Sequence, residues 1–310
     1  MKKIERWQDN KESYILGNGF VLKRADKHEF GIHEAIYSNA DLELSFSWRI
    51  LTSANENSDN LFWIYRDDKR IGGVHIGPNV MSSFFMEVPY IYDRFIVITA
   101  LNDALSEWSN DEESIKIYGV IPEDIHYFNR LGYRIMRSRR VMIRPTETFD
   151  DIDWGKDYMI KVPDINDVLK IGRLFFESYS GGIDYECFGE QNLQEAIESA
   201  KYVLNVYREN NTLEGSTLVF DKNTKELVGA CLAGINGFCD NGFSEIGEVV
   251  VKPEYRNRGI ASRMIKRALT NLKRISPATI LCVTIGNSSE ALYNNLGFFP
   301  GIKFTNMVLK

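Results

Sequence analysis

Apolar and polar positions follow two different periods along the chain, and the change is clearest around Pro253. β-Branched residues run from Ile246 to Val251 and stop before this proline, which cannot donate a backbone hydrogen bond into a continuing strand. From Gly259 onward, apolar residues recur every three or four positions: Ile260, Ala261, Met264, Ile265, Ala268, Leu269 and Leu272. The pattern predicts a strand, a short loop and an amphipathic helix.

The rest of the second half gives further strands and helices by the same periods. The predicted helices are Ile165–Tyr179, Asn192–Tyr202 and a short one over Ser289–Asn295 that Gly297 ends. The predicted strands are Ser216–Phe220, Leu227–Leu232 and Ile280–Thr284. Ser180-Gly181-Gly182 breaks the first helix, and Asp221 to Thr224 form a turn.

The first half contains a weaker copy of the second. Three pairs of segments are similar: Val21–Asp26 and Met159–Asp164, Arg70–Gly73 and Glu226–Gly229, Tyr127–Tyr133 and Leu292–Phe298. Their spacing is nearly constant, since Pro89 then matches Pro253 and Gly132 matches Gly297. This regularity predicts an internal repeat.

Length and composition agree with two globular domains. At 310 residues the chain favours two domains of about 150 residues each. Apolar residues make up 44% and charged residues 26%, which is typical of a globular protein. The net charge of -6 argues against nucleic acid as a main partner, because phosphate binding needs a basic surface.

Membrane and metal roles are not expected. The N-terminus lacks the apolar stretch of a secretory signal, and no run approaches the roughly 18 apolar residues of a membrane span, so we expect a cytoplasmic protein with no membrane partner. The cysteines show no Cys-x-x-Cys spacing, which predicts neither a metal site nor a disulfide framework; they are Cys187, Cys231, Cys239 and Cys282.

The loop before the amphipathic helix has the composition of an anion site. At a helix N-terminus the first N–H groups lack intrahelical partners and the dipole favours negative charge. Gly259 and Ala261 allow close approach to the backbone, and Arg256 and Arg258 add positive charge. The alternative is an ordinary turn that uses glycine for its geometry.

Two motifs in register carry a family resemblance. Val251, Pro253, Arg256, Gly259 and Ala261 have the spacing that resembles the acetyl-coenzyme A pyrophosphate loop of the GNAT (N-acetyltransferase) superfamily. A second GNAT motif follows: Asn287, Ala291-Leu292-Tyr293 and Leu296-Gly297-Phe298. The loop is neither a Walker A sequence nor a dinucleotide fingerprint, because it lacks their glycine and lysine positions.

The resemblance implies an α/β (α+β) fold of two GNAT-like domains, each with a mixed, mostly antiparallel central sheet flanked by helices. We expect a degenerate domain at 1–145, an acidic linker at 146–154 and an acetyl-CoA-binding domain at 155–310. In the first copy Phe95 stands opposite Gly259 and Phe128 opposite Tyr293, which adds bulk to the loop and removes the hydroxyl. A misalignment by a few residues is the alternative.

The same resemblance implies an acyl-CoA-dependent N-acyltransferase. Acetyl-CoA would be the cosubstrate, and a primary amine of a small molecule or peptide would accept the acetyl group directly in a ternary complex. The expected contacts of coenzyme A are Val249, Val250, Val251, Arg256, Asn257, Arg258, Gly259, Ile260, Ala261, Ser262, Asn287 and Tyr293. Transfer of another acyl group and a non-catalytic acetyl-CoA sensor remain alternatives, and the oligomeric state is not predicted.

Catalysis needs an acid for the leaving thiolate and a base for the amine. By resemblance Tyr293 is the expected acid, with an aromatic packing role as the alternative. Every histidine lies in the first half, so the candidate bases are Glu245 and Glu248, or water. A solvent-facing carboxylate is the structural alternative. The acceptor specificity is expected in the loop Ser180–Glu190.

Overall fold

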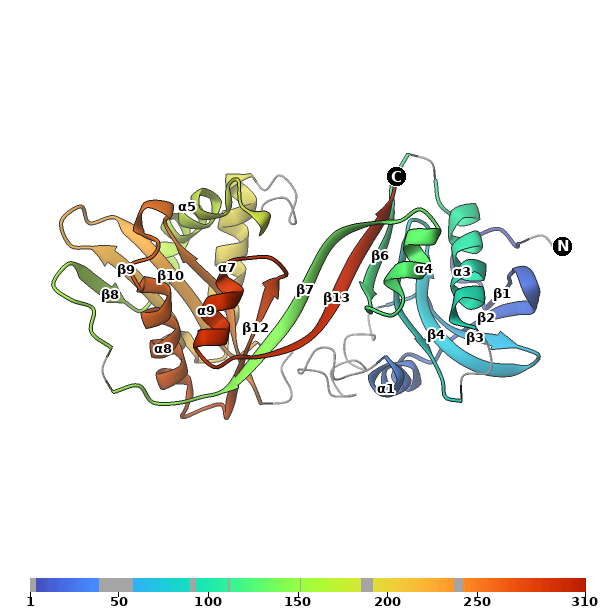
Figure 1. The fold of residues 1–310 in the computed structure, drawn as a ribbon, viewed down its shortest axis with the longest axis horizontal. Helices are drawn as coiled ribbons and strands as arrows, with labels where there is room; N and C mark the ends of the chain where they lie inside the picture. The colour runs from blue at the N-terminus through green and yellow to red at the C-terminus, as the bar shows by residue number, and fades with distance from the viewer. Residues whose placement is uncertain are drawn as a thin grey trace. The chain divides into compact units, whose positions relative to one another are not determined.

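The computed structural model describes residues 4–38, 58–89, 93–110, 112–150, 152–184, 192–236 and 242–310. The chain divides into two compact units, which we call unit 1 (Met1–Arg140 with Ile302–Lys310) and unit 2 (Val141–Gly301) (Figure 1). Contiguous domains at 1–145 and 155–310 were expected. The observed division differs because residues 302–310 belong to unit 1.

Unit 1 is a mixed sheet with helices. Its strands are β1 (Ser13–Ile15), β2 (Phe20–Arg24), β3 (Leu61–Arg66), β4 (Lys69–Gly77), β5 (Val80–Met86), β6 (Ile115–Val120) and the first part of β7 (Arg134–Pro145). Its helices are α1 (Lys27–Tyr37), α3 (Arg94–Trp108) and α4 (Ile125–Arg130). The strand order is β1-β2-β3-β4-β5-β6-β13; β5 and β6 pair in parallel, and β1–β2, β2–β3, β3–β4, β4–β5 and β6–β13 pair antiparallel.

The strand β13 (Phe299–Leu309) completes this sheet. It runs antiparallel to β6, with Met307 opposite Ile117 and Leu309 opposite Ile115. Met307 is fully buried in the apolar core of unit 1. Residues at the far end of the sequence therefore supply both a strand and a core side chain to the unit that begins at the N-terminus.

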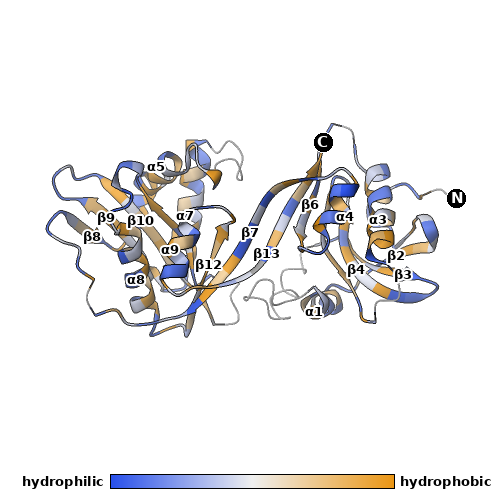
Figure 2. Ribbon diagram, in the orientation of Figure 1, coloured by the Kyte–Doolittle hydropathy of each residue, from blue (hydrophilic) through white to orange (hydrophobic). Residues whose placement is uncertain are grey.

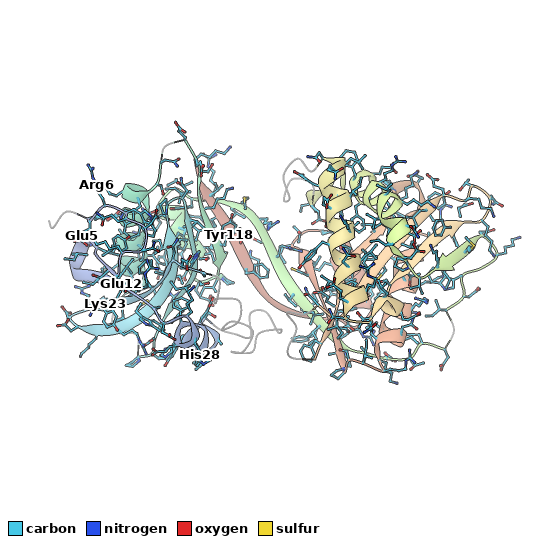
Figure 3. The ribbon with its side chains drawn as sticks, turned by 180° about the vertical axis from the view of Figure 1, so that it is seen from behind. Glu5, Arg6, Glu12, Lys23, His28 and Tyr118 are labelled. Atoms are coloured by element: carbon cyan, nitrogen blue, oxygen red, sulfur yellow. The ribbon has the colours of Figure 1, made fainter. Side chains whose placement is uncertain are left out.

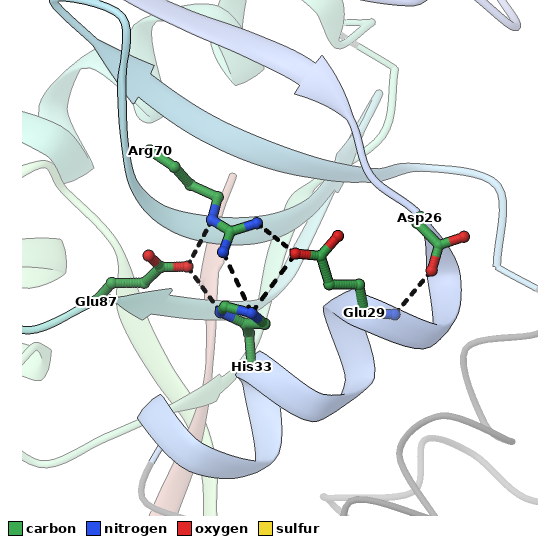
Figure 4. Close-up of polar contacts among 5 residues, drawn as sticks. All are labelled: Asp26, Glu29, His33, Arg70 and Glu87. Atoms are coloured by element: carbon green, nitrogen blue, oxygen red, sulfur yellow. Dashed lines mark hydrogen bonds and ion pairs between the residues drawn. The ribbon is translucent and has the colours of Figure 1, made fainter.

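An ion network fixes α1 to the sheet of unit 1 (Figure 4). The guanidinium of Arg70, at the start of β4, donates to Glu29 on α1 at 2.7 Å and contacts Glu87, just after β5, at 2.9 Å. His33 of α1 lies 2.8 Å from the same Glu87 oxygen. The Asp26 carboxylate accepts from the Glu29 N–H at 2.8 Å and caps the helix.

Unit 2 repeats this order of elements. Its strands are β8 (Tyr158–Lys161), β9 (Thr217–Asp221), β10 (Leu227–Gly234), β11 (Ser244–Val251) and β12 (Ala278–Thr284), in the order β7-β12-β11-β10-β9-β8. Its helices are α5 (Val168–Tyr179), α7 (Leu193–Glu209), α8 (Ile260–Leu272) and α9 (Ser289–Asn295). The shared order of strands and helices agrees with the internal repeat, and both short helices α4 and α9 precede a glycine with positive φ, Gly132 (95°) and Gly297 (82°).

Two apolar cores cover the two faces of the unit 2 sheet. The α8 stripe packs on one face with Ile246, Val251 and Leu281, and α5 and α7 pack on the other with Leu232 and Val250. All residues of β10 are buried, and the strand carries the hydrophobic colour in Figure 2. Sheet residues can therefore be assigned to an α8 face or an α5/α7 face.

Segment 146–154, expected as a linker, lies in unit 2. The Phe149 N–H donates to Thr270 on α8 at 3.0 Å, and Phe149 and Trp154 pack against the α8-side core. An acidic stretch without periodicity can thus still be held by two aromatic side chains.

The positions of one histidine and of three cysteines can be compared with the sequence analysis. His28 is exposed on α1 and labelled in Figure 3, and Cys231 is buried on β10; Cys187 and Cys239 lie outside the described residues. Among the helices that the structure describes, none is both long and apolar enough to cross a membrane.

Candidate active site

Strands β11 and β12 separate where the motif residues lie. Their parallel pairing covers Ser244–Ile246 and Thr279–Leu281, whereas β11 continues to Val251 and β12 to Thr284. Beyond Ile246 the ladder between these two strands ends. Because Val250 faces Ala230 of β10, the backbone N–H groups that point to that side are those of Val249 and Val251, where a ligand could insert between the strands.

A β-bulge at Gly247 sets the direction of the candidate bases. Ile246 stands opposite Ala233 and Glu248 opposite Leu232, so Gly247 is the extra residue. In a regular strand, residues three positions apart point to opposite faces. The extra residue turns both Glu245 and Glu248 toward the α5/α7 face.

Glu245 is held by a tyrosine of α7. The Tyr207 hydroxyl donates to its carboxylate at 2.8 Å, and a Cβ at Gly247 would lie 2.5 Å from that hydroxyl oxygen. Burial raises the pKa of Glu245, although the hydrogen bonds from Tyr207 and Asn236 act in the opposite direction. The carboxylate is thus partly desolvated rather than facing solvent.

Glu248 has an equivalent partner on α5. The Tyr179 hydroxyl donates to the Glu248 carboxylate. Burial, followed by the charge of Glu248, raises the pKa of Tyr179 well above its ordinary value. Tyr179 is therefore neutral at physiological pH and keeps its proton available for the carboxylate.

Tyr293 lies on α9 with its ring packed edge-on against Phe298 at 6.1 Å between centroids. Burial raises its pKa to about 12, while a hydrogen bond with Ser289 acts to lower it. The charges of Cys231, Glu248 and Asp184 add smaller contributions to the rise. The group is protonated at neutral pH, as a proton donor must be.

Asn287 orients the start of α9. Its side-chain oxygen accepts from the Ser289 N–H at 2.9 Å and from the Ser289 hydroxyl at 2.8 Å. Its amide nitrogen donates to Asp184 at 2.5 Å. Asp184 opens the expected acceptor segment 184–190, of which residues 185–190 lie outside the described residues.

The loop between β11 and α8 has the backbone that an anion site needs. Asn257 and Gly259 have φ values of 62° and 74°, and no side chain caps the helix N-terminus. An added Cβ at Gly259 would meet nothing closer than the Arg263 guanidinium at 3.7 Å, so glycine is required by the left-handed backbone. Ile260 is buried in the core, so it offers only its N–H, and Ala261 packs beside it.

The loop arginines already have partners. Arg256 donates to the Ser178 carbonyl at 2.8 Å and to the Val251 carbonyl at 3.1 Å, which ties the loop to α5. Arg258 donates to the Glu254 carbonyl at 2.9 Å. Ser262 lies half-buried in the first turn of α8. Positive charge is present beside the loop, but the Arg256 side chain also has a structural function.

The matching helix of unit 1 is closed to an anion. At the N-terminus of α3 the Asp93 carboxylate accepts from the Phe95 N–H at 2.7 Å. The Phe95 ring stacks on Tyr127 at 5.4 Å, and Arg130 covers the same ring at 4.1 Å. A carboxylate therefore takes the position that a phosphate would need, which agrees with the expected degenerate copy.

The family model described as "Acetyltransferase (GNAT) family" matches residues 183–298. Unit 2 carries a GNAT domain. No curated protein matches the chain by sequence.

Solved structures share the fold of this chain over nearly its whole length. A GCN5-related N-acetyltransferase from Sphaerobacter thermophilus is 15% identical, covers 95% of this chain and 96% of its own, and has a TM-score of 0.70. A tandem GNAT protein from the clavulanic acid biosynthesis pathway is 10% identical, with 94% and 97% covered and a TM-score of 0.57. A GNAT-family acetyltransferase from Colwellia psychrerythraea is 9% identical, with 93% and 98% covered and a TM-score of 0.55.

Three residues near the GNAT motifs were not expected from the sequence. Tyr179 and Tyr207 continue the apolar stripes of α5 and α7, so the sequence alone indicates two aromatic side chains packed in the core. Thr284 ends a buried strand, and nothing in the sequence marks its hydroxyl. Their partners come from distant segments, and only the folded chain brings them together.

Proposed function

We propose that the GNAT domain transfers an acetyl group from acetyl-CoA to a primary amine of a small molecule or peptide. The observation that carries this proposal is the uncapped N-terminus of α8, reached by a loop with two left-handed residues directly after the open end of β11. Such a loop offers backbone N–H groups to a diphosphate. Acetyl-CoA, when bound, supplies the activated acetyl thioester.

The residues of the chain have separate roles in this proposal. Residues 256–262 would hold the diphosphate, and the edge of β11 at Val249 and Val251 would pair with the pantetheine arm. Val250 faces Ala230 of β10, so its N–H lies in that ladder and is not directed at the thioester carbonyl as the sequence suggested. Asn287, three residues after the end of β12, would donate the second hydrogen of its amide nitrogen to the same arm. Tyr293, neutral because of its burial, would donate a proton to the leaving thiolate.

Glu245 is the proposed base. Burial raises its pKa, which brings a carboxylate closer to the range in which a general base works near neutral pH. The Tyr207 hydroxyl fixes its position. Direct transfer then requires both substrates to be bound together, with the amine deprotonated on the α5/α7 face.

Two measurements test this function. Calorimetric titration should find one coenzyme A site per chain, and release of free thiol from acetyl-CoA should depend on an added amine. Gly259→Asp should weaken coenzyme A binding by more than about tenfold, because it adds negative charge and strain at the loop. Gly155→Asp is the control, since Gly155 also has a positive φ (62°) with open space around it. Equal binding by both variants would contradict the proposed site.

A further inference from the structure

Two carboxylates, Glu248 and Asp184, contact residues of α5 and of the segment just before α9. Glu248 accepts a hydrogen bond from Tyr179, and Asp184 accepts one from Asn287. The charges of both carboxylates act on the hydroxyls of Tyr179 and Tyr293. Glu248 thus contacts α5, and Asp184 contacts Asn287, which lies just before α9, the helix that carries Tyr293.

A buried hydroxyl on the neighbouring strand has no partner. Thr284 is 4% exposed, and its Oγ1 makes no hydrogen bond within the described part of the chain. Along β12, Leu281 and Val283 belong to the α8-side core, so alternation places Thr284 on the opposite, α5/α7 face. An unsatisfied buried hydroxyl costs free energy, which favours a ligand that completes it.

Glu248 and Thr284 both lie where β11 and β12 no longer pair. Glu248 lies on β11 beyond the last residue paired with β12, and Thr284 is the last residue of β12. Both face α5 and α7. A ligand there would meet negative charge and a neutral hydroxyl together.

We propose that the acceptor is an alkyl amine with two cationic amino groups, with Glu248 and Asp184 as counter-charges and the Thr284 hydroxyl as a hydrogen-bond acceptor. This proposal rests on the function given above and names its substrate class. Desolvating several carboxylates is unfavourable unless cations compensate them. A diamine compensates two charges, whereas a monoamine compensates one and an amino acid adds a further negative charge.

A trio of acceptors with similar chain length tests the substrate class. With acetyl-CoA, 1,5-diaminopentane should give a kcat/KM at least about tenfold above that of pentylamine, because one more charge-assisted hydrogen bond forms. The third compound, 5-aminopentanoate, should be the poorest acceptor. Equal kcat/KM values for the three compounds would overturn the proposal while leaving the transferase function in place.

Two variants that remove the same charge show whether Glu248 causes the preference for the diamine over pentylamine. Glu248→Gln should reduce kcat/KM for the diamine about tenfold and narrow its advantage over pentylamine. Glu209→Gln removes the same charge from an exposed position on α7 and should keep that advantage. If both variants reduce the preference equally, the effect comes from net charge and the proposed site is wrong.

Thr284→Val provides a second variant that does not remove charge. Valine has nearly the same shape, so the variant should fold with a higher melting temperature because a buried unsatisfied hydroxyl is gone. It should also raise KM for the diamine. A raised melting temperature with unchanged KM would show that Thr284 does not contact the acceptor.

A binding measurement separates failure of this inference from failure of the proposed function. Calorimetry with 1,5-diaminopentane and coenzyme A needs no turnover. Binding by the wild-type protein that Glu248→Gln abolishes supports the cation site even if no acetyl group is transferred. Absence of diamine binding, with thiol release still observed for another amine, overturns the cation site alone.

Discussion

Three buried tyrosine hydroxyls determine the protonation of the candidate active site. Tyr179 and Tyr207 each donate to a carboxylate of β11, and burial raises the pKa of both. The Tyr293 hydroxyl is hydrogen-bonded with Ser289, and burial raises its pKa to about 12. All three stay protonated at neutral pH, so two can position glutamates while the third keeps a proton to donate.

Removing the Tyr293 hydroxyl tests its role as an acid. Tyr293→Phe should reduce kcat by about 100-fold, the usual size of a general acid contribution, and should leave coenzyme A affinity nearly unchanged. Steady-state kinetics and calorimetry measure the two quantities. The aromatic contact with Phe298 remains in the variant, so an unchanged kcat would mean that Tyr293 only packs.

The raised pKa of Glu245 links stability to pH. The folded protein holds this proton more tightly than the unfolded chain, so the contribution to stability is complete below the ordinary pKa of 4.5 and is lost as pH rises through the raised value. Glu245→Gln removes this dependence while its carbonyl can still accept from Tyr207. The melting temperature of the variant relative to wild type should therefore increase between pH 5 and pH 8. A constant difference across this range would contradict the raised pKa.

At the scale of elements, the helix N-termini differ most between the two units. Gly259 precedes α8 without a side-chain cap, whereas Asp93 caps α3 with its carboxylate. Both helices follow a strand that pairs in parallel with its neighbour over only part of its length. The difference at one residue decides whether the helix can receive an anion.

Several elements could be predicted from the sequence because their signals are local. The helix Ser289–Asn295 was predicted with its exact bounds, since Gly297 and the small polar residues before it mark both ends. The helix predicted to end at Tyr202 runs to Glu209, because Leu204 and Tyr207 continue its buried stripe. The carboxylate–tyrosine pairs could not be predicted, because each joins a strand to a distant helix.

The ion network on α1 gives a stability prediction for unit 1. Arg70→Met should lower the free energy of unfolding by about 1–2 kcal/mol, because it leaves the Glu87 carboxylate, 16% exposed, without its guanidinium. The measurement is denaturant unfolding. Lys27→Met removes a charge from a more exposed pair with Asp59 and should change the same quantity by less than about 0.5 kcal/mol. Similar losses in both variants would argue against a special role for the network.

At the scale of the whole molecule, unit 2 is one continuous segment, Val141–Gly301, whereas unit 1 combines Met1–Arg140 with Ile302–Lys310. The chain passes from unit 1 to unit 2 within β7 and returns within β13. Hydrophobic alternation specifies which face of a strand is buried but not which strand lies beside it. For this reason the sequence predicted two contiguous domains, whereas β13 pairs with β6.

Matched methionine variants test this exchange of strands. Met307 and Met264 are both fully buried, the first in the core of unit 1 and the second in that of unit 2. Each change to alanine should cost about 2–5 kcal/mol. Hydrogen exchange should show lost protection in β3–β6 for Met307→Ala and in β10–β12 for Met264→Ala. Loss of protection in β10–β12 for both variants would contradict the assignment of residues 302–310 to unit 1.

The position of β13 also has a consequence for protein synthesis. Domains generally fold in order as they leave the ribosome, beginning at the N-terminus. Unit 1 cannot complete its sheet in this way, because the edge of β6 stays unpaired until residues 302–310 have emerged. From the synthesis of β6 (Ile115–Val120) until residues 302–310 emerge, the nascent chain therefore exposes an open strand edge to which a ribosome-associated chaperone would bind.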